Sequence, residues 1–232
     1  MAKKKLTRFA EILHFDNVVH AGIEDVFNRK HPLSGRWAAG FFGSHKPVII
    51  ELGCGKGEYA VGMAEMFPGR NFIGIDIKGA RLWKGAKHAH NNKMQNVGFL
   101  RTRIELITSF FDRDEVDEIW ITFPDPQPRK ARKRLTSPGF LNRYRSFLKS
   151  GGPVHLKTDN RELYEYTLSV IEANRLAILE KTTDLYGSGA VGKILSIKTY
   201  YEQQFLDQGK PIFYLKFRID APGEITGPDE TK

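Results

Sequence analysis

Short apolar runs alternate with longer amphipathic segments from residue 47 to the end of this 232-residue chain. Runs rich in branched and aromatic residues predict strands at 48–52, 71–75, 97–100, 118–123, 153–157, 177–185 and 211–219. Apolar residues at helical spacing predict helices at 58–67, 78–91, 105–111, 139–149 and 161–174. We therefore expect an α/β fold with helices on both faces of a mostly parallel sheet of seven strands, the last two forming an antiparallel pair.

Three segments depart from this alternation. Residues 1–46 are basic and aromatic, and we expect them to form an N-terminal extension to one domain that spans 47–220. Residues 124–138 contain four prolines and five basic residues, too much proline for a helix or a central strand. Residues 221–232 combine Pro, Gly, Asp and Glu, so this tail is expected to fray.

The charge of the chain favours a polyanionic partner. Lys and Arg number 36 against 27 Asp and Glu, which gives a net charge of +9. Fixed positive charge attracts phosphate groups and releases their counterions. An equally basic surface without a partner has the same composition, so the positions of the charges must decide.

Cysteine content and apolar run length bear on the compartment. Cys54 is the single cysteine, so no intramolecular disulfide forms, and a reducing, cytoplasmic location is expected. The basic start lacks the apolar core of a signal peptide. The longest apolar runs fall far short of the roughly 20 residues that span a bilayer, so no membrane insertion is expected.

A glycine-rich turn follows the first predicted strand in the segment Glu51-Leu-Gly-Cys-Gly-Lys-Gly. Gly53 and Gly55 allow the backbone to turn sharply and to approach a ligand closely. Asp76 ends the second predicted strand, where a carboxylate accepts hydrogen bonds from ribose hydroxyls. Together these features predict an adenosine ligand.

The glycine spacing and Glu51 favour S-adenosylmethionine among adenosine ligands. Dinucleotide sites use G-x-G-x-x-G to bind a pyrophosphate, whereas this chain has G-x-G-x-G. The carboxylate of Glu51 repels a pyrophosphate and attracts the ammonium and sulfonium groups of the methyl donor. The alternatives are an ordinary strand-to-helix turn and a nicotinamide-dependent oxidoreductase.

Asp125 follows the strand at 118–123, at the edge where open α/β sheets bind ligands. Pro124 and Pro126 fix the backbone on both sides of its carboxylate. Five basic residues follow directly: Arg129, Lys130, Arg132, Lys133 and Arg134. Because they lie next to the predicted ligand edge, we interpret them as phosphate-binding residues and not as an ordinary solvated surface.

Four segments of the chain resemble the bacterial tRNA (guanine-N7)-methyltransferases: the glycine segment, Phe123-Pro-Asp-Pro-Gln-Pro-Arg-Lys, His155-Leu-Lys-Thr-Asp-Asn and Thr199-Tyr-Tyr-Glu. The resemblance extends from Glu51 to the last predicted strand. It implies a Rossmann-like class I methyltransferase fold, S-adenosylmethionine as cofactor and tRNA as partner. It also implies methylation of guanine at position 46, in the variable loop. Both a monomer and a homodimer agree with the sequence.

The resemblance also implies roles for individual residues. Those expected at the cofactor are Glu51, Gly53, Gly55, Asp76, Arg103 and Asp125, and those expected at the RNA are Arg129, Asp159, Thr199 and Glu202. The chain departs from the family at three positions: Asp76 replaces the usual Glu, Arg103 falls where Asp or Asn is common, and Gln127 replaces Trp.

Two of the residues expected at the RNA have structural alternatives. Asp159 precedes a predicted helix and has the chemistry of an N-cap. Thr199 and Glu202 have the spacing of a capping box, in which each side chain binds the backbone of the other residue.

Methylation at guanine N7 requires little from the protein's side chains. N7 carries a lone pair and no proton, so no general base is needed. Asp125 is the candidate catalytic residue, because a carboxylate stabilises the positive charge that develops on the ring. No cluster of His, Cys and carboxylates has metal-ligand spacing, so no metal is expected. Other interpretations are a non-catalytic RNA-binding protein and methylation of a protein or small molecule.

Overall fold

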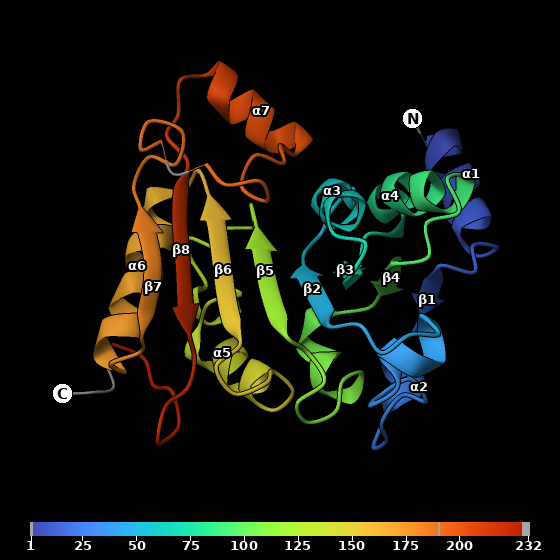
Figure 1. The fold of residues 1–232 in the computed structure, drawn as a ribbon, viewed down its shortest axis with the longest axis horizontal. Coiled ribbons are helices and arrows are strands. Elements are labelled where there is room, and N and C mark those ends of the chain that lie inside the picture. The colour runs from blue at the N-terminus through green and yellow to red at the C-terminus, as the bar shows by residue number, and fades with distance from the viewer. Residues whose placement is uncertain (1, 190, 229–232) are drawn as a thin grey trace.

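A single eight-stranded sheet organises the computed structural model, which describes residues 2–189 and 191–228, with side chains from residue 6 onward (Figure 1). The spatial order of the strands is β1-β4-β3-β2-β5-β6-β8-β7. The strands are β1 Val18–His20, β2 Val48–Leu52, β3 Asn71–Ile75, β4 Val97–Arg101, β5 Glu118–Thr122, β6 Pro153–Thr158, β7 Ile178–Thr182 and β8 Phe213–Arg218. Strand β8 runs antiparallel to β6 and β7, while the other strand pairs of the described residues are parallel, so the predicted α/β class is confirmed.

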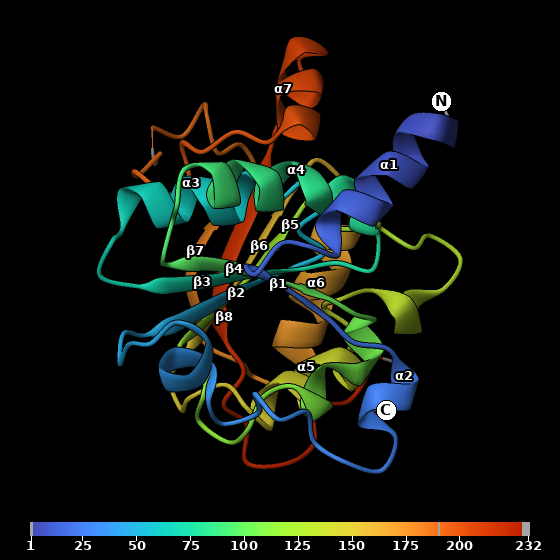
Figure 2. The ribbon, with the colours of Figure 1, turned by 90° about the vertical axis from the view of Figure 1, so that its right-hand side faces the viewer.

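Helices cover both faces of the sheet (Figure 2). One face carries α1 (Ala2–Ile12), α3 (Glu58–Met66) and α4 (Gly79–Asn91), and the other carries α5 (Pro138–Arg145) and α6 (Arg161–Ala173). The short helix α2 (Ile23–Val26) follows the carboxyl end of β1, while α7 (Tyr200–Asp207) lies beyond the carboxyl ends of β5 and β6. No helix in the described part of the chain is long and apolar enough to cross a membrane.

The chain reverses its direction across the sheet between β2 and β5. From β2 it builds outward through β3 and β4, and it then returns to place β5 on the other side of β2. All five residues of β2 are buried, as expected of a central strand covered on both faces. In such sheets the carboxyl ends beside the reversal form the ligand crevice.

The segment before residue 47 adds an eighth strand to the sheet, where the sequence predicted seven, and the division into an N-terminal extension and a domain over 47–220 stays a prediction. Strand β1 pairs in parallel with β4, and Trp37 is completely buried, with its indole N–H donating to the carbonyl of Phe110 at 2.8 Å. Helix α1 joins α4 through Glu11, whose carboxylate accepts hydrogen bonds from Trp83 and Lys87. A three-residue strand is too short to show a period of two, so the sequence pattern did not predict it.

The tail is attached to the domain as far as residue 228, contrary to the expected fraying. Ile225 is 1% exposed, and the side chain of Asn142 binds its backbone N–H and carbonyl at 3.0 and 2.8 Å. Asn174 binds the backbone of Thr226 in the same way. One apolar side chain and two amides therefore fix a segment of polar composition. The expectation for residues 229–232 lies outside the described part of the chain.

Replacing Ile225 by alanine should lower the free energy of unfolding by about 2–5 kcal/mol, because it removes a buried side chain and leaves a cavity. Urea unfolding measures this change. Glu224→Ala is the matched control, because Glu224 is an exposed neighbour and the substitution should change stability by no more than about 0.5 kcal/mol. Equal stability of the two variants would show that the tail does not pack in solution.

Candidate functional site

A cleft of about 500 Å³ opens at the carboxyl ends of β2, β3 and β5, beside the reversal of the chain. Six of the residues predicted from the sequence line it: Gly53, Gly55, Asp76, Arg103, Asp125 and Thr199. Glu51, Arg129, Asp159 and Glu202 do not line it. The structure therefore brings the predicted cofactor loop and Asp125 together in one cavity.

The glycine loop forms one end of the cleft. Gly53, Gly55 and Gly57 have φ angles of +75°, +55° and +71°, which residues other than glycine rarely adopt. Gly57 is also the N-cap of α3, and a Cβ atom there would lie 2.6 Å from the ring of Phe99. Asp76 accepts hydrogen bonds from the N–H groups of Gly55, at 2.9 Å, and of Lys78. The loop is thus bound to the end of β3.

Glu51 lies beneath the glycine loop and is 1% exposed. Its carboxylate accepts hydrogen bonds from the backbone N–H of Ala60, at 2.9 Å, and from the hydroxyl of Thr122. Ala60 is in the first turn of α3 and Thr122 ends β5, so this side chain joins the central strand to a helix on one face of the sheet and to one neighbouring strand. Burial raises the pKa of Glu51 to about 8. Its contact with the cofactor stays a prediction.

Thr102 and Ile77 also line the cleft, and neither was predicted from the sequence. The Thr102 hydroxyl is buried at the cleft wall and has no hydrogen-bond partner among the described residues. Ile77 is 47% exposed on the same wall and offers apolar surface. A buried polar atom without a partner costs free energy, so a ligand that binds it is favoured. Each residue follows the end of a strand, β4 or β3, and this position is the signal that would have found them.

The loop after β5 holds Asp125 at the exposed side of the cleft. Phe123 and Gln127 both have φ of +47°, a rare conformation for side-chain-bearing residues that often occurs at functional sites. Asp125 accepts a hydrogen bond from the N–H of Gln127 at 3.1 Å, which closes a tight turn. The loop is therefore shaped by backbone constraint on both sides of the carboxylate.

Arg134 differs from the other basic residues of this loop because it is buried. Its guanidinium donates to the carbonyl of Pro126 at 3.0 Å, pairs with Glu162 and lies over the ring of Tyr166. It thus binds the Asp125 loop to α6 and presents no charge to a partner. Arg129, Lys130, Arg132 and Lys133 are exposed.

The predicted N-cap role of Asp159 was wrong, because Asn160 caps α6 by accepting the N–H of Leu163 at 2.8 Å. The carboxylate of Asp159 instead lies 3.8 Å from the ammonium of Lys210. Burial raises the pKa of Asp159. The capping box of Thr199 and Glu202 is present at the start of α7. Glu202 is completely buried and offers no carboxylate oxygen at the surface.

Comparison with known proteins identifies the family. Residues 45–215 match the Methyltransf_4 family model, described as "Putative methyltransferase". A tRNA (guanine-N(7)-)-methyltransferase of Bacteroides thetaiotaomicron is 51% identical, over 99% of this chain and 91% of that protein. A protein of the same name from Porphyromonas gingivalis is 54% identical, over 85% and 82%. The chain belongs to the tRNA (guanine-N(7)-)-methyltransferase family. The predicted family is therefore confirmed.

Solved structures share the fold of this family member at low sequence identity. The 16S rRNA methyltransferase KamB superposes with a TM-score of 0.59 at 14% identity, covering 77% of this chain and 92% of that one. A 16S rRNA (adenine(1408)-N(1))-methyltransferase from Catenulisporales acidiphilia, solved with its cosubstrate SAM, gives a TM-score of 0.52 at 15% identity, covering 78% and 90%. These likenesses support the methyltransferase type of α/β fold.

Glu51→Gln should flatten the pH dependence of stability. The folded state raises the pKa of Glu51 from 4.5 to about 8, so the folded chain binds more protons than the unfolded chain between these values. Stability from this group is full below pH 4.5 and is lost as pH rises toward 8, by at most about 1.4 kcal/mol per pH unit. Urea unfolding at pH 5 to 8 should show that the free energy of unfolding of the variant increases relative to that of the wild type as pH rises.

Glu172→Gln, at an exposed position on α6, is the matched control and should keep the wild-type pH dependence. Parallel pH profiles for the wild type and Glu51→Gln would contradict the assignment of a raised pKa to Glu51.

Proposed function

We propose that this chain transfers a methyl group from S-adenosylmethionine to N7 of guanine 46 in the variable loop of tRNA. The observation that carries the proposal is a single cleft lined both by the glycine loop with Asp76 and by Asp125. Membership of a family whose relatives are named tRNA (guanine-N(7)-)-methyltransferases supports the choice of substrate. A tRNA substrate also agrees with a cytoplasmic location.

The cleft fits S-adenosylmethionine, which supplies an electrophilic methyl group. Gly53 and Gly55 allow close approach to the backbone, and Asp76 lines the wall where it can accept hydrogen bonds from ribose hydroxyls. Thr102 and Ile77 offer one polar and one apolar contact to the adenine ring. In this proposal the side chain of Arg103 lies beside the adenine ring. Glu51 supports the bound S-adenosylmethionine from beneath the glycine loop.

Asp125 is the proposed catalytic residue. The lone pair of guanine N7 accepts the methyl group directly, so no side chain has to remove a proton. The ring becomes cationic, and a carboxylate at its edge stabilises that charge or accepts hydrogen bonds from guanine N1 and N2. Because the loop of Asp125 is fixed by its turn and by Arg134, the carboxylate is oriented before the base arrives.

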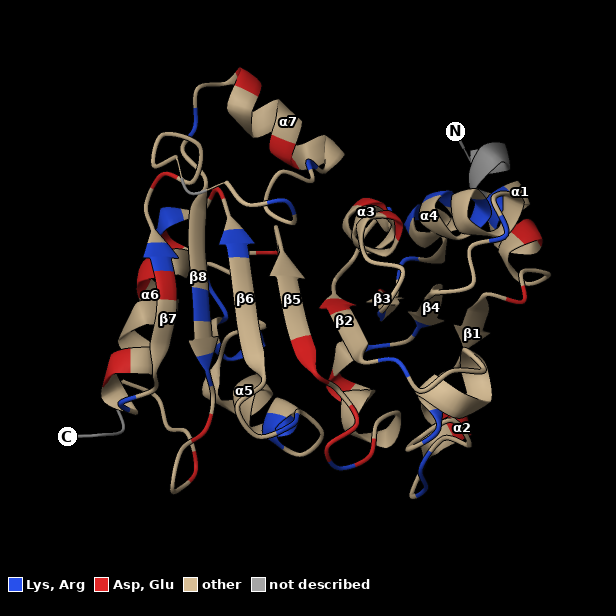
Figure 3. Cartoon of the chain, viewed as in Figure 1, with Lys and Arg blue, Asp and Glu red and all other residues tan. Residues whose placement is uncertain are grey.

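Positive charge around the cleft supports binding of the RNA backbone. The exposed residues Arg129 and Lys130 follow Asp125, and Lys and Arg also occur along α4, with Arg8 on the adjacent α1 (Figure 3). Contacts to phosphates position a nucleic acid without reading its sequence. Asp159 and Thr199 are proposed to contact the substrate nearer the target base.

Incubation with labelled S-adenosylmethionine and unmodified tRNA should yield 7-methylguanosine in nucleoside analysis. A transcript with adenine at position 46 should remain unlabelled. Methylation of both transcripts would contradict the assigned position. Saturable tRNA binding without any methyl transfer would contradict the enzymatic function and indicate an RNA-binding protein.

Asp125→Asn should lower kcat by about 100-fold or more, because it removes the charge that stabilises the transition state. The amide oxygen still accepts the N–H of Gln127, so the loop should keep its shape. Calorimetry with S-adenosylmethionine separates this loss of turnover from any change in cofactor affinity. Turnover close to the wild-type value would refute the catalytic role.

Replacing Arg129 and Lys130 by alanine should weaken tRNA binding and reduce the slope of log affinity against log salt. The expected reduction is about one unit per lost phosphate contact. Arg113→Ala is the matched control, because Arg113 is exposed before β5, at the opposite edge of the sheet. A slope that falls equally in the control would show that the effect is not local to the loop.

A further inference from the structure

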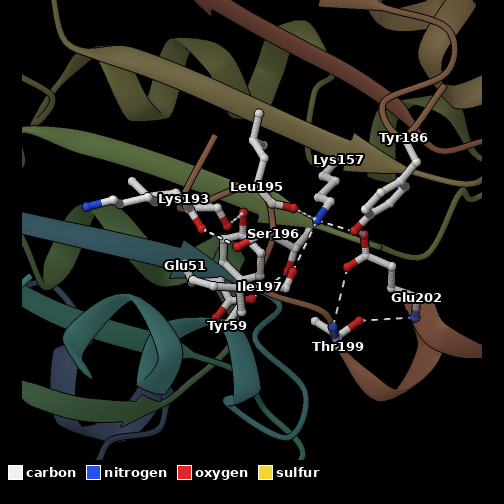
Figure 4. Close-up of polar contacts among 12 residues, drawn as sticks. Glu51, Tyr59, Lys157, Tyr186, Lys193, Leu195, Ser196, Ile197, Thr199 and Glu202 are labelled. Atoms are coloured by element: carbon white, nitrogen blue, oxygen red, sulfur yellow. Dashed lines mark hydrogen bonds and ion pairs between the residues drawn. The ribbon is translucent and has the colours of Figure 1, made fainter. Parts of the chain in front are cut away.

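A buried ion pair connects two of the sequence motifs (Figure 4). Lys157 is near the end of β6 and Glu202 is in the first turn of α7, and both side chains are 0% exposed. The ammonium nitrogen lies 2.7 Å from the carboxylate. A pair of this kind is costly to desolvate, so it needs good geometry and further hydrogen bonds.

The two charged groups have hydrogen bonds in addition to the ion pair. The ammonium of Lys157 also donates to the carbonyls of Leu195, at 2.9 Å, and Ile197, at 3.2 Å, so its three N–H donors have three acceptors. The carboxylate of Glu202 accepts the hydroxyl of Tyr186 at 2.7 Å and the N–H of Thr199 at 3.4 Å. Burial lowers the pKa of Lys157, and Glu202 opposes that change.

These contacts fix a segment that has no regular structure of its own. Between residues 183 and 199 the described chain forms neither helix nor strand, and it lies over the ends of β5 and β6. The hydroxyl of Tyr59 donates to the carbonyl of Ile194 at 2.8 Å. The side chain of Ile197 packs against Gly62, where an added Cβ would lie 3.0 Å from it. Lys157 binds this segment through the carbonyls of Leu195 and Ile197.

The segment leads directly to the wall of the cleft. Thr199 and Tyr201 line the same cleft as Asp125. The N–H of Tyr200 donates to Glu58 at 2.8 Å, and the ammonium of Lys56 lies 3.4 Å from the centre of the Tyr200 ring. The position of this wall therefore depends both on the glycine-loop side and on the ion pair.

We propose that Lys157 is a positioning residue that sets the cleft wall formed by Thr199 and Tyr201, and that Glu202 acts through Lys157 without touching RNA. The assignment of this wall to the RNA side rests on the proposed function. Apolar side chains of equal volume would give comparable stability without fixing one arrangement of the carbonyls. The role of the ion pair is therefore to fix the position of the cleft wall.

Limited proteolysis tests whether Lys157 holds residues 183–199 in place, and it needs no assay of methyl transfer. Lys193 and Lys198 are exposed within it, so trypsin can cut there once the segment is released. Lys157→Met should raise the rate of cleavage after these two residues by about tenfold or more. Asn174→Ala, which removes contacts to the tail, is the control and should not change this rate. Unchanged cleavage in Lys157→Met would overturn the proposal.

Kinetics test the positioning of the wall. Lys157→Met leaves a buried carboxylate unpaired and can fail to fold, so the neutral pair Lys157→Met with Glu202→Gln is the second variant. It should fold and bind S-adenosylmethionine with unchanged affinity, but show kcat/KM for tRNA lowered by about tenfold or more. Asn174→Ala, of matched or lower stability, should keep wild-type kcat/KM. Wild-type kcat/KM in the folded double variant would overturn the proposal.

The role of Glu202 is decided by comparing the double variant with each single variant that folds. Action through Lys157 predicts that Glu202→Gln and the double variant lose kcat/KM equally, within about twofold. A direct RNA contact predicts a further loss when Glu202→Gln is added to Lys157→Met, and it would overturn the proposal. Absence of methylation by the wild-type chain would refute the proposed function alone, and the proteolysis would still decide whether Lys157 holds the segment.

Discussion

The carboxylate of Glu51 is the contact on which the architecture of the cleft depends. It sits at the end of β2, where the chain reverses across the sheet, and it binds the first turn of α3 and the end of β5. The glycine loop leaves β2 immediately above it, and the Asp125 loop leaves β5 immediately beyond Thr122. A single buried group therefore sets the separation of the two loops between which a methyl group is to be transferred.

Glu51 and Glu202 share a feature that the sequence did not reveal. Both belong to motifs that resemble ligand-binding segments, yet both carboxylates are buried and bound to protein groups. Their partners, Thr122 and Lys157, are distant in sequence, so burial follows from the tertiary fold and not from local pattern. A motif can thus indicate a site correctly while its charged residue acts by shaping the site from within.

The sequence predicted the central strands closely because buried parallel strands leave continuous apolar runs, and the ends of β2 and β3 match the predicted ones. It also placed the glycine loop, Asp76 and Asp125 at one edge of the sheet. It missed β1 and the attached tail, since their stability comes from contacts with β4 and with Asn142 and Asn174. Thr102 escaped notice because only its position in the cleft, with an unpartnered hydroxyl, distinguishes it from other threonines.

The two walls of the cleft are fixed by different means. The Asp125 wall is stiffened locally, by prolines, a tight turn and the buried Arg134, so its shape is encoded within ten residues. The Thr199 wall has a capping box at the start of α7 and a bond to Glu58, and it also depends on a lysine from β6, about forty positions earlier in the chain. The position of the Thr199 wall therefore follows from the tertiary fold, whereas the turn at Asp125 is set within its own loop.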